Sequence, residues 1–263
     1  MSLVLIVALM ILGTLGGFAA GLLGFGGGVL MFPLLLYCPP LIGLAAIDAK
    51  AVAAIVASQV FFSTLAGGLA HLRRGRVQGQ IAMIAGIVSA VGSLTGSVAS
   101  KWASDRFLLI LFGAVTLLVI GIMLLAAPHD DQEETSADRV TVPRVALSVY
   151  SFLTGVVIGF LGAGNFVFVP VLIYLLHVPT RIAIGSSLFI AMMNTAAGFL
   201  GKWVTGQIPL LATVMVVAGA IIGALAGEKV HRRLSSALLR QVYAVLVALI
   251  ALRVWLTILG LDA

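Results

Sequence analysis

Long apolar runs separated by short polar interruptions occupy almost the whole chain. Seven of the runs are each long enough for one helix across a bilayer: about 51–70, 80–99, 107–127, 144–162, 182–201, 209–228 and 238–258. An eighth apolar stretch, 2–37, is too long for a single span, and glycines interrupt it at 24–28. This pattern predicts an all-α polytopic integral membrane protein with a broken hydrophobic segment near its start.

One hydrophilic stretch, "PHDDQEETSADRVTVPR" at 128–144, divides the chain near its middle. It is too short for a soluble domain and has the composition of a linker. We therefore expect 1–127 to form an N-terminal membrane repeat, 128–143 a hydrophilic connector and 144–263 a C-terminal membrane repeat.

The two sides of this connector repeat one pattern. "GFAAGLLGFGGGVLMFPLLLY" at 17–37 matches "GVVIGFLGAGNFVFVPVLIY" at 155–174, with one residue fewer in the second copy. The aligned residues are Gly17, Gly21, Gly24, Gly26, Pro33 and Tyr37 in the first copy and Gly155, Gly159, Gly162, Gly164, Pro170 and Tyr174 in the second. The match predicts two repeats of about five helical segments, each including a Gly-broken short or re-entrant helix pair.

The charges of the loops indicate how the repeats are oriented. If 2–37 crosses twice, or dips in and returns, most of the Lys and Arg residues share one side of the membrane, as cytoplasmic loops do. The repeats then have inverted topology, both termini lie outside the cytoplasm, and the three tryptophans lie near the outer interface. The inner set is Arg73, Arg74, Arg76, Arg139, Arg144, Arg181, Lys229, Arg232 and Arg233, and the outer set is Lys50, Lys101, Arg106 and Lys202, with Arg253 nearby.

Composition supports a membrane protein and excludes several functions. The chain is 62% hydrophobic and 9% charged, whereas soluble domains carry about 25% charged residues. Its net charge of +6 is scattered over short loops, so we expect no nucleic-acid partner. The single cysteine, the four separate histidines and the lack of a nucleophile or paired acids predict no metal site, no cofactor and no enzyme activity.

The broken segments are the first candidates for a binding site. Glycines at membrane depth must face protein or a polar path, because unpaired backbone groups cost several kcal/mol in hydrocarbon. The helix that starts after each break presents free N–H groups and a partial positive charge, which suits an anion. We therefore predict substrate-binding roles for Gly26, Gly27 and Gly28 in the first copy and for Gly164 and Asn165 in the second.

Other glycines are better explained by close packing of helices. On this basis Gly27→Leu should abolish transport, whereas Gly92→Ala should leave most of it. The glycines assigned to packing are Gly13, Gly17, Gly21, Gly92, Gly96, Gly223 and Gly227.

Polar side chains inside the later spans complete the candidate site. The substrate-binding candidates are Gln59, Ser63, Ser186, Ser187 and Asn194, whose amides and hydroxyls suit an oxyanion. Hydrogen bonding between helices is the alternative role for each serine. Lys50, Arg181 and Lys202 are candidates for attracting the anion, and snorkelling to the lipid interface is the alternative for them.

The two signatures "GLLGFGGGVLMFPLLL" and "GFLGAGNFVFVPVLIY…RIAIGSSLF" resemble those of the TauE/SafE sulfite exporter family, also called the TSUP (toluene-sulfonate uptake permease) family. The resemblance covers nearly the whole chain and departs from the usual glycine run at Asn165 and Phe166. It implies transport of sulfite, sulfoacetate or other small organosulfonate anions. A cytoplasm-negative potential favours anion export by about 2.3 kcal/mol per charge per 100 mV.

We therefore expect a secondary transporter, an exporter in the cell (inner) membrane, that works by alternating access around a midplane anion site. Three alternatives stay open: transport of another small organic anion such as a carboxylate, import coupled to protons or sodium, and a passive channel. A membrane-embedded enzyme or assembly factor would need a nucleophile, paired acids or metal ligands within the bundle, and the sequence offers none. The expected partners are the lipid bilayer and a small sulfur-containing anion, with a homodimer as a further alternative.

Overall fold

The computed structural model describes residues 3–23, 27–72, 79–125, 142–172, 176, 178, 180–231 and 236–260. Several of the features predicted above lie outside these residues: Gly24, Gly26, Tyr174, the connector up to residue 141, and Arg73, Arg74, Arg76, Arg232 and Arg233 of the inner set. The side chains of Asn165 and Arg181 lie outside the description too.

Helices account for nearly all of the described residues, which contain no strand. The elements are α1 (Leu3–Leu23), α2 (Gly28–Leu41), α3 (Ala49–Leu72), α4 (Gly79–Ala99), η1 (Ser100–Trp102), α5 (Asp105–Leu125), α6 (Arg144–Leu161), α7 (Asn165–Pro170), α8 (Thr180–Val204), α9 (Leu210–His231) and α10 (Ser236–Ile258). Within the described part, α1, α4, α5, α6 and α9 are long and apolar enough to cross a membrane. The prediction of an all-α polytopic membrane protein is confirmed.

The predicted breaks end α1 and α6, and a new helix follows each. Gly27 caps α2 in the left-handed conformation (φ 61°), and its carbonyl accepts from the amides of Leu30 and Met31 at 3.1 and 3.0 Å. Gly164 caps α7 in a different conformation (φ 152°), and its carbonyl accepts from the Val167 amide at 2.9 Å. The structure therefore aligns Gly164 with Gly27, whereas the sequence match paired it with Gly26. Asn165 accordingly stands where the first copy has Gly28.

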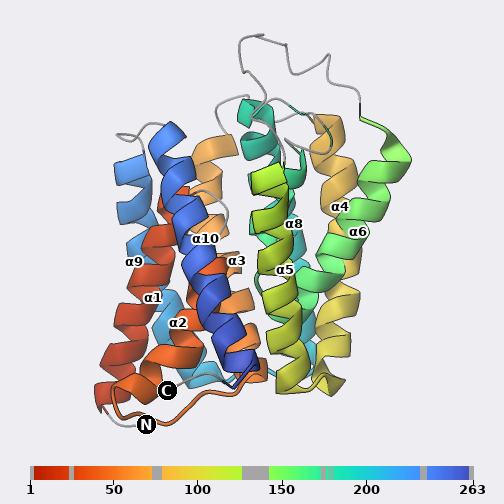
Figure 1. The fold of residues 1–263 in the computed structure, drawn as a ribbon. Helices are drawn as coiled ribbons and strands as arrows, with labels where there is room; N and C mark the ends of the chain where they lie inside the picture. The colour runs from red at the N-terminus through yellow and green to blue at the C-terminus, as the bar shows by residue number, and fades with distance from the viewer. Residues whose placement is uncertain are drawn as a thin grey trace.

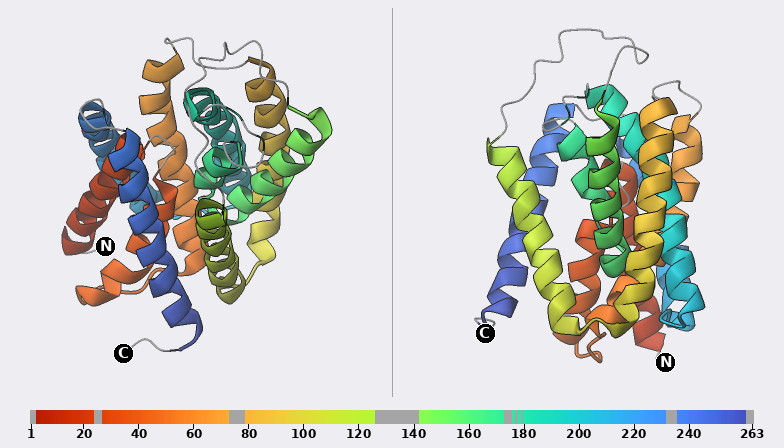
Figure 2. Two further views of the ribbon diagram at one scale, coloured as in Figure 1. Left: turned by 45° about the horizontal axis from the view of Figure 1, so that its top comes forward. Right: turned by 90° about the vertical axis from the view of Figure 1, so that its right-hand side faces the viewer.

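Helix pairing follows the repeat. α1 packs along α9, and their counterparts α6 and α4 pack along each other, while α3 packs on α8 and α5 on α10. Figure 1 shows α1 rising from the end where α10 finishes, and α6 descending from the opposite end. Figure 2 shows α1 and α9 on one side of the bundle and α4, α6 and α8 on the other. The inverted-repeat relation itself stays a prediction.

Glycines allow the backbones to touch at both of these interfaces. A Cβ on residue 13 or 17 of α1 would meet the backbone of α9, and one on residue 92 or 96 of α4 would meet the backbone of α6. The packing role of Gly13, Gly17, Gly92, Gly96, Gly223 and Gly227 is confirmed. The expectation that Gly92→Ala is tolerated does not fit this contact, because the added methyl group would meet the Phe152 carbonyl.

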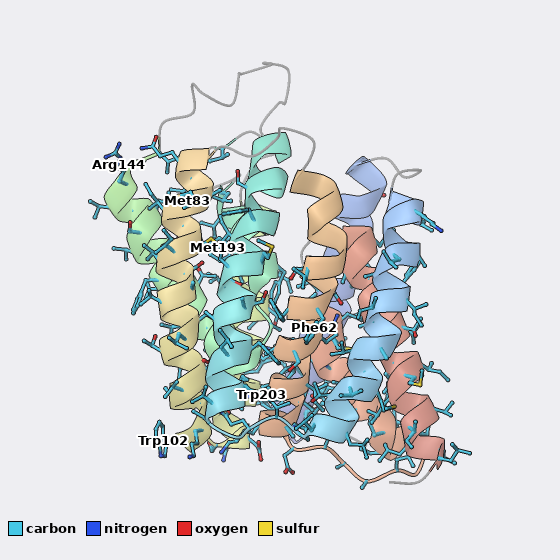
Figure 3. All side chains as sticks on the ribbon, turned by 180° about the vertical axis from the view of Figure 1, so that it is seen from behind. Phe62, Met83, Trp102, Arg144, Met193 and Trp203 are labelled. Atoms are coloured by element: carbon cyan, nitrogen blue, oxygen red, sulfur yellow. The ribbon has the colours of Figure 1, made fainter. Side chains whose placement is uncertain are left out.

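Charged and aromatic residues mark the two ends of the bundle. Figure 3 shows Trp102 and Trp203 at one end and Arg144 at the other. The Lys50 ammonium donates to the Lys101 carbonyl at 2.9 Å, so these lysines share the end that carries Trp102. We call this the tryptophan end, and it is the end that the charge pattern predicts to lie outside the cytoplasm.

Candidate functional site

The two breaks meet in the interior of the bundle. A Cβ on residue 28 would lie 3.0 Å from Ala163 Cβ, in the second break, and 3.0 Å from Val60 Cγ2 of α3. Gly28, Ala163 and Val60 are all buried. The prediction that the broken segments face protein rather than lipid is confirmed for the described residues.

Close packing and backbone conformation explain the glycines of the breaks. Gly27 has positive φ and packs on α1, where a Cβ would lie 2.7 Å from the Ala20 amide nitrogen. Gly162 also has positive φ (68°) and packs on α3, where a Cβ would lie 2.6 Å from the Ala57 nitrogen. Gly164 has φ 152° and packs on Ile158. Substrate contact by any of these glycines stays a prediction.

On α3 the predicted polar pair is formed. Gln59 Nε2 donates to Ser63 Oγ at 3.1 Å, one turn along the helix, and both residues are buried. Gln59 Oε1 has no hydrogen-bond partner. Because Ser63 Oγ accepts from Gln59, its own proton is left to be donated to a third group.

On α8 the polar side chains are buried too. Asn194 is 0% exposed, and neither its oxygen nor its nitrogen has a hydrogen-bond partner. Ser186 and Ser187, about two turns earlier, are buried as well. The next residue, Thr195, donates to the Ala191 carbonyl of its own helix at 2.6 Å and so satisfies its hydroxyl locally. Asn194 is therefore the polar side chain of α8 that most clearly lacks a structural partner.

An aromatic contact joins α3 and α8. Phe61 stacks on Phe199 with ring centroids 5.4 Å apart, and all three of Phe61, Phe62 and Phe199 are half-buried. Successive helical residues point about 100° apart, so Gln59 and Ser63 point about 160° from Phe61 and Asn194 points about 140° from Phe199. Gln59, Ser63 and Asn194 therefore point away from this aromatic contact, and their joining in a single site stays a prediction.

Asn194 lies on the side of α8 that packs on α4. Its neighbours on α8 touch α4: Met193 meets Gly86, and a Cβ on residue 198 would lie 2.8 Å from Ser93 Oγ. Ser151 of α6 is one turn before Gly155, which packs on the Ser89 backbone of α4. Ser93 and Ser151 are fully buried, and their hydroxyls have no hydrogen-bond partner. Gly159, two turns after Ser151, is the residue of α6 that packs on Ser93, so Ser93 and Ser151 lie about 12 Å apart along the helices. We call Ser93, Ser151 and Asn194, which lie at successive levels of these helices, the α4–α6–α8 cluster.

A row of serines in the sequence of α4 and η1, which does not enter the predicted site, indicates this polar lining. Ser89, Ser93, Ser97 and Ser100 recur at helical spacing and are all 0% exposed. Figure 3 shows Met193, next to Asn194, and Phe62, next to Ser63, toward the middle of the bundle. The uncommitted polar groups of both helices therefore lie far from either end.

Two of the three candidate cations, Lys50 and Lys202, are at the tryptophan end. Lys202 is 0% exposed, so it does not snorkel to the lipid interface. Lys50 is half-buried at the start of α3, where its amide donates to Asp105 Oδ1 at 2.9 Å. Arg181 belongs to the first turn of α8, and its side chain lies outside the description. In the part of the chain described, no group of three His, Cys, Asp or Glu residues could hold a metal ion.

Comparisons with known proteins bear on the whole chain. A family model described as "Sulfite exporter TauE/SafE" matches residues 9–254. A "Probable membrane transporter protein" of Xylella fastidiosa (strain 9a5c) is 34% identical over 260 residues, which cover 92% of each chain. The "Probable membrane transporter protein YunE" of Bacillus subtilis (strain 168) is 26% identical over 264 residues, 93% of this chain and 95% of that protein. No solved structure matches at a significant level.

Proposed function

This chain belongs to the sulfite exporter TauE/SafE family of multi-pass membrane transporters, and from that membership we propose that it exports sulfite or a small organosulfonate anion. The proposal extends to alternating access around a site in the middle of the bundle. It also places the protein in the inner membrane with the tryptophan end outside.

The α4–α6–α8 cluster is the observation that carries this proposal. Burying a polar group without a partner costs about 1–3 kcal/mol, so Ser93, Ser151 and Asn194 together are expensive for a purely structural role. A ligand that supplied the missing hydrogen bonds would recover this cost. Such groups in a membrane interior commonly mark a substrate path.

The chemistry of the cluster suits a small oxyanion. Asn194 and Ser93, which faces Gly198 one turn after Asn194, offer three hydrogens to donate, and a sulfite or sulfonate group has three oxygens to accept them. Ser151, about two turns from Ser93 along the helices, would contact the anion at a different level. The buried side chains that the structure describes include no Asp or Glu, so no carboxylate among them repels a negative charge. The Gln59–Ser63 pair on α3 is the counterpart of this site in the first half, because Ser63 and Asn194 are equivalent in the repeat.

The membrane potential supplies a driving force for export. A cytoplasm-negative potential of 100 mV favours the exit of one negative charge by about 2.3 kcal/mol. Export of a sulfonate by uniport therefore needs no coupling ion. Import of the same anion would have to be coupled to protons or sodium.

A proteoliposome assay with a matched pair of variants tests the site. Because Asn194 makes no hydrogen bond within the protein, Asn194→Ala should leave the unfolding temperature unchanged or raised. It should lower sulfite and sulfoacetate efflux by about 10- to 100-fold, the equivalent of one hydrogen bond to a charged group. Thr195→Ala is the control, since its hydroxyl bonds only to its own helix. Equal efflux by the two variants would remove Asn194 from the site.

A thermal-stability assay tests the substrate, and the efflux assay tests the mechanism. Purified protein should be stabilised against heat by sulfite, sulfoacetate or taurine, and a preference for carboxylates over these compounds would overturn the substrate class. Efflux whose rate does not change with an imposed membrane potential would contradict electrogenic uniport. Saturable flux with counterflow distinguishes a carrier from a channel.

A further inference from the structure

Lys202 is a buried cation without a compensating negative charge. Its ammonium donates to Ser100 Oγ at 2.8 Å and to the Phe160 carbonyl at 3.3 Å. Both acceptors are neutral, and no carboxylate of the described residues pairs with it. An ammonium has three hydrogens to donate, so one has no acceptor in the described structure. Lys50 is close enough to exert Coulomb repulsion on this charge.

A structural role accounts for only part of this arrangement. Phe160 is in the last turn of α6, and a cation there is stabilised by the negative end of the helix dipole, typically by about 0.3–1 kcal/mol. Moving an ammonium out of water costs several kcal/mol even after the protein relaxes. One long hydrogen bond to a helix end and one hydroxyl do not offset that cost.

A seam of small and polar residues leads from the α4–α6–α8 cluster to Lys202. α4 and α8 run in the same direction (Figure 1), and their facing residues pair in order. Ser93 faces Gly198, Ser97 faces Gly201, and Ser100 bonds to Lys202. Asn194 and Lys202 are eight residues apart on α8, which is about 12 Å along the helix axis. We call this line of contacts the α4–α8 seam.

The seam is closed at the tryptophan end by a network of neutral hydrogen bonds. Gln207 Nε2 donates to the Ser97 carbonyl at 2.9 Å and to Thr205 Oγ1 at 2.7 Å. The Ser100 hydroxyl lies 2.9 Å from Gln207 Oε1. Lys202 is thus joined through Ser100 to the turn that follows α8. Each bond in this closure is one that an incoming anion could replace.

We propose that Lys202 is a second anion-binding station, which receives a small oxyanion from the α4–α6–α8 cluster at the closed end of the α4–α8 seam. The arriving anion takes the ammonium away from Ser100 and Phe160, and so weakens the contact that joins α8 to η1. Lys50, half-buried at the same end, is the next positive charge on the way out. The identity of the anion rests on the function proposed above, whereas the station itself rests on the seam.

Anion-dependent stability tests the station without requiring transport. Purified full-length protein is heated at constant ionic strength in gluconate, then with sulfite or sulfoacetate added under anaerobic conditions. The unfolding midpoint should rise with added anion, with a half-saturating concentration about 10- to 100-fold higher in Lys202→Gln than in wild type. Lys202→Arg should keep most of the affinity. Lys101→Gln, which removes an exposed charge from the same end, should match wild type.

Ser100→Ala separates an anion station from a structural contact and serves if Lys202→Gln does not fold. The variant keeps the charge of Lys202 but removes the Ser100 hydroxyl that accepts a hydrogen bond from the Lys202 ammonium. The half-saturating anion concentration should therefore fall several-fold below that of wild type. A half-saturating concentration that is unchanged in both Ser100→Ala and Lys202→Gln would overturn the station.

Efflux from proteoliposomes distinguishes the two proposals. If wild type releases neither sulfite nor sulfonate while anions still stabilise it through Lys202, the transport proposal is wrong and the station is right. If efflux occurs at wild-type rate in Lys202→Gln, and the thermal shift is unchanged as well, the station is wrong and the transport proposal is untouched.

Discussion

Two groups of three helices in this protein share a packing scheme and differ in what lines it. In α4, α6 and α8, the glycines of α4 and α6 pack on the partner backbone, and buried serines fill the remaining positions. In the counterpart group, α9, α1 and α3, the glycines pack in the same way. There, Ala220 and Ala224 occupy the positions of Ser89 and Ser93. Figure 2 shows the α4–α6 and α1–α9 pairs on opposite sides of the bundle.

The difference separates what the scaffold needs from what the function needs. Alanine satisfies the packing on one side, so the serine hydroxyls on the other side are not required for helices to touch. The hydroxyl of Ser93 has no hydrogen-bond partner, although it is 0% exposed. The polar lining of one group is therefore best explained by a ligand that passes between these helices. The contrast concerns α4 and α9 alone, because α3 of the second group carries the buried Gln59–Ser63 pair.

The largest expected effect concerns the shared scaffold. A Cβ on residue 159 would meet the Ser93 carbonyl and lie 2.5 Å from the Ser97 nitrogen, and one on residue 227 would meet the Phe18 carbonyl. Gly159→Ala and Gly227→Ala should each destabilise the protein by about 1–3 kcal/mol or more, because backbone cannot move aside as a side chain can. Thermal unfolding in detergent measures this.

Gly121→Ala is the control for the scaffold, since a Cβ there meets nothing within 4 Å. It should be neutral or stabilise the helix by about 0.5–1 kcal/mol. If only one of the two scaffold variants is destabilised, the two interfaces are not equivalent and the comparison fails.

An exchange of side chains between the groups should have an intermediate effect, on transport alone. Ser93→Ala loses no hydrogen bond, so stability should hold while sulfite efflux falls by about tenfold, the lower limit for a bond to a charged group. Ala224→Ser adds the hydroxyl on the apolar side and should leave efflux at the wild-type level. Efflux from proteoliposomes of the two variants measures the contrast. A loss of efflux in both would place the path on both sides.

The smallest expected effect concerns a contact that one group has and the other lacks. Tyr150 of α6 donates to the Val167 carbonyl of α7 at 3.0 Å, beside the second break. The equivalent residue in α1 is Leu12. Tyr150→Phe should cost about 0.5–1.5 kcal/mol, the net contribution of one hydrogen bond. A chemical or thermal unfolding series should show this loss, with Leu12→Met as a volume-matched change near neutrality.

The sequence predicted the elements better than the site. Long apolar runs define α3–α6 and α8–α10 within a few residues, because a membrane span must satisfy its own backbone and leaves little freedom of length. The breaks were found from glycines that recur in both copies. The direction of Asn194 was not predictable, because it depends on which neighbour α8 meets at that level. The burial of Lys202 was not predictable either, since a lysine near a helix end usually reaches the interface.

The glycine-packed interfaces also govern the order in which the protein can be completed during synthesis. Each of them joins a helix encoded before the connector to one encoded after it: α1 with α9, and α4 with α6. α1 ends at Leu23, and its partner begins only at Leu210. At about 5–20 residues per second, α1 must wait some 10–40 s in the membrane for the surface that covers it. The chain therefore cannot mature half by half, and its first helix depends throughout that interval on lipid or on an insertion factor.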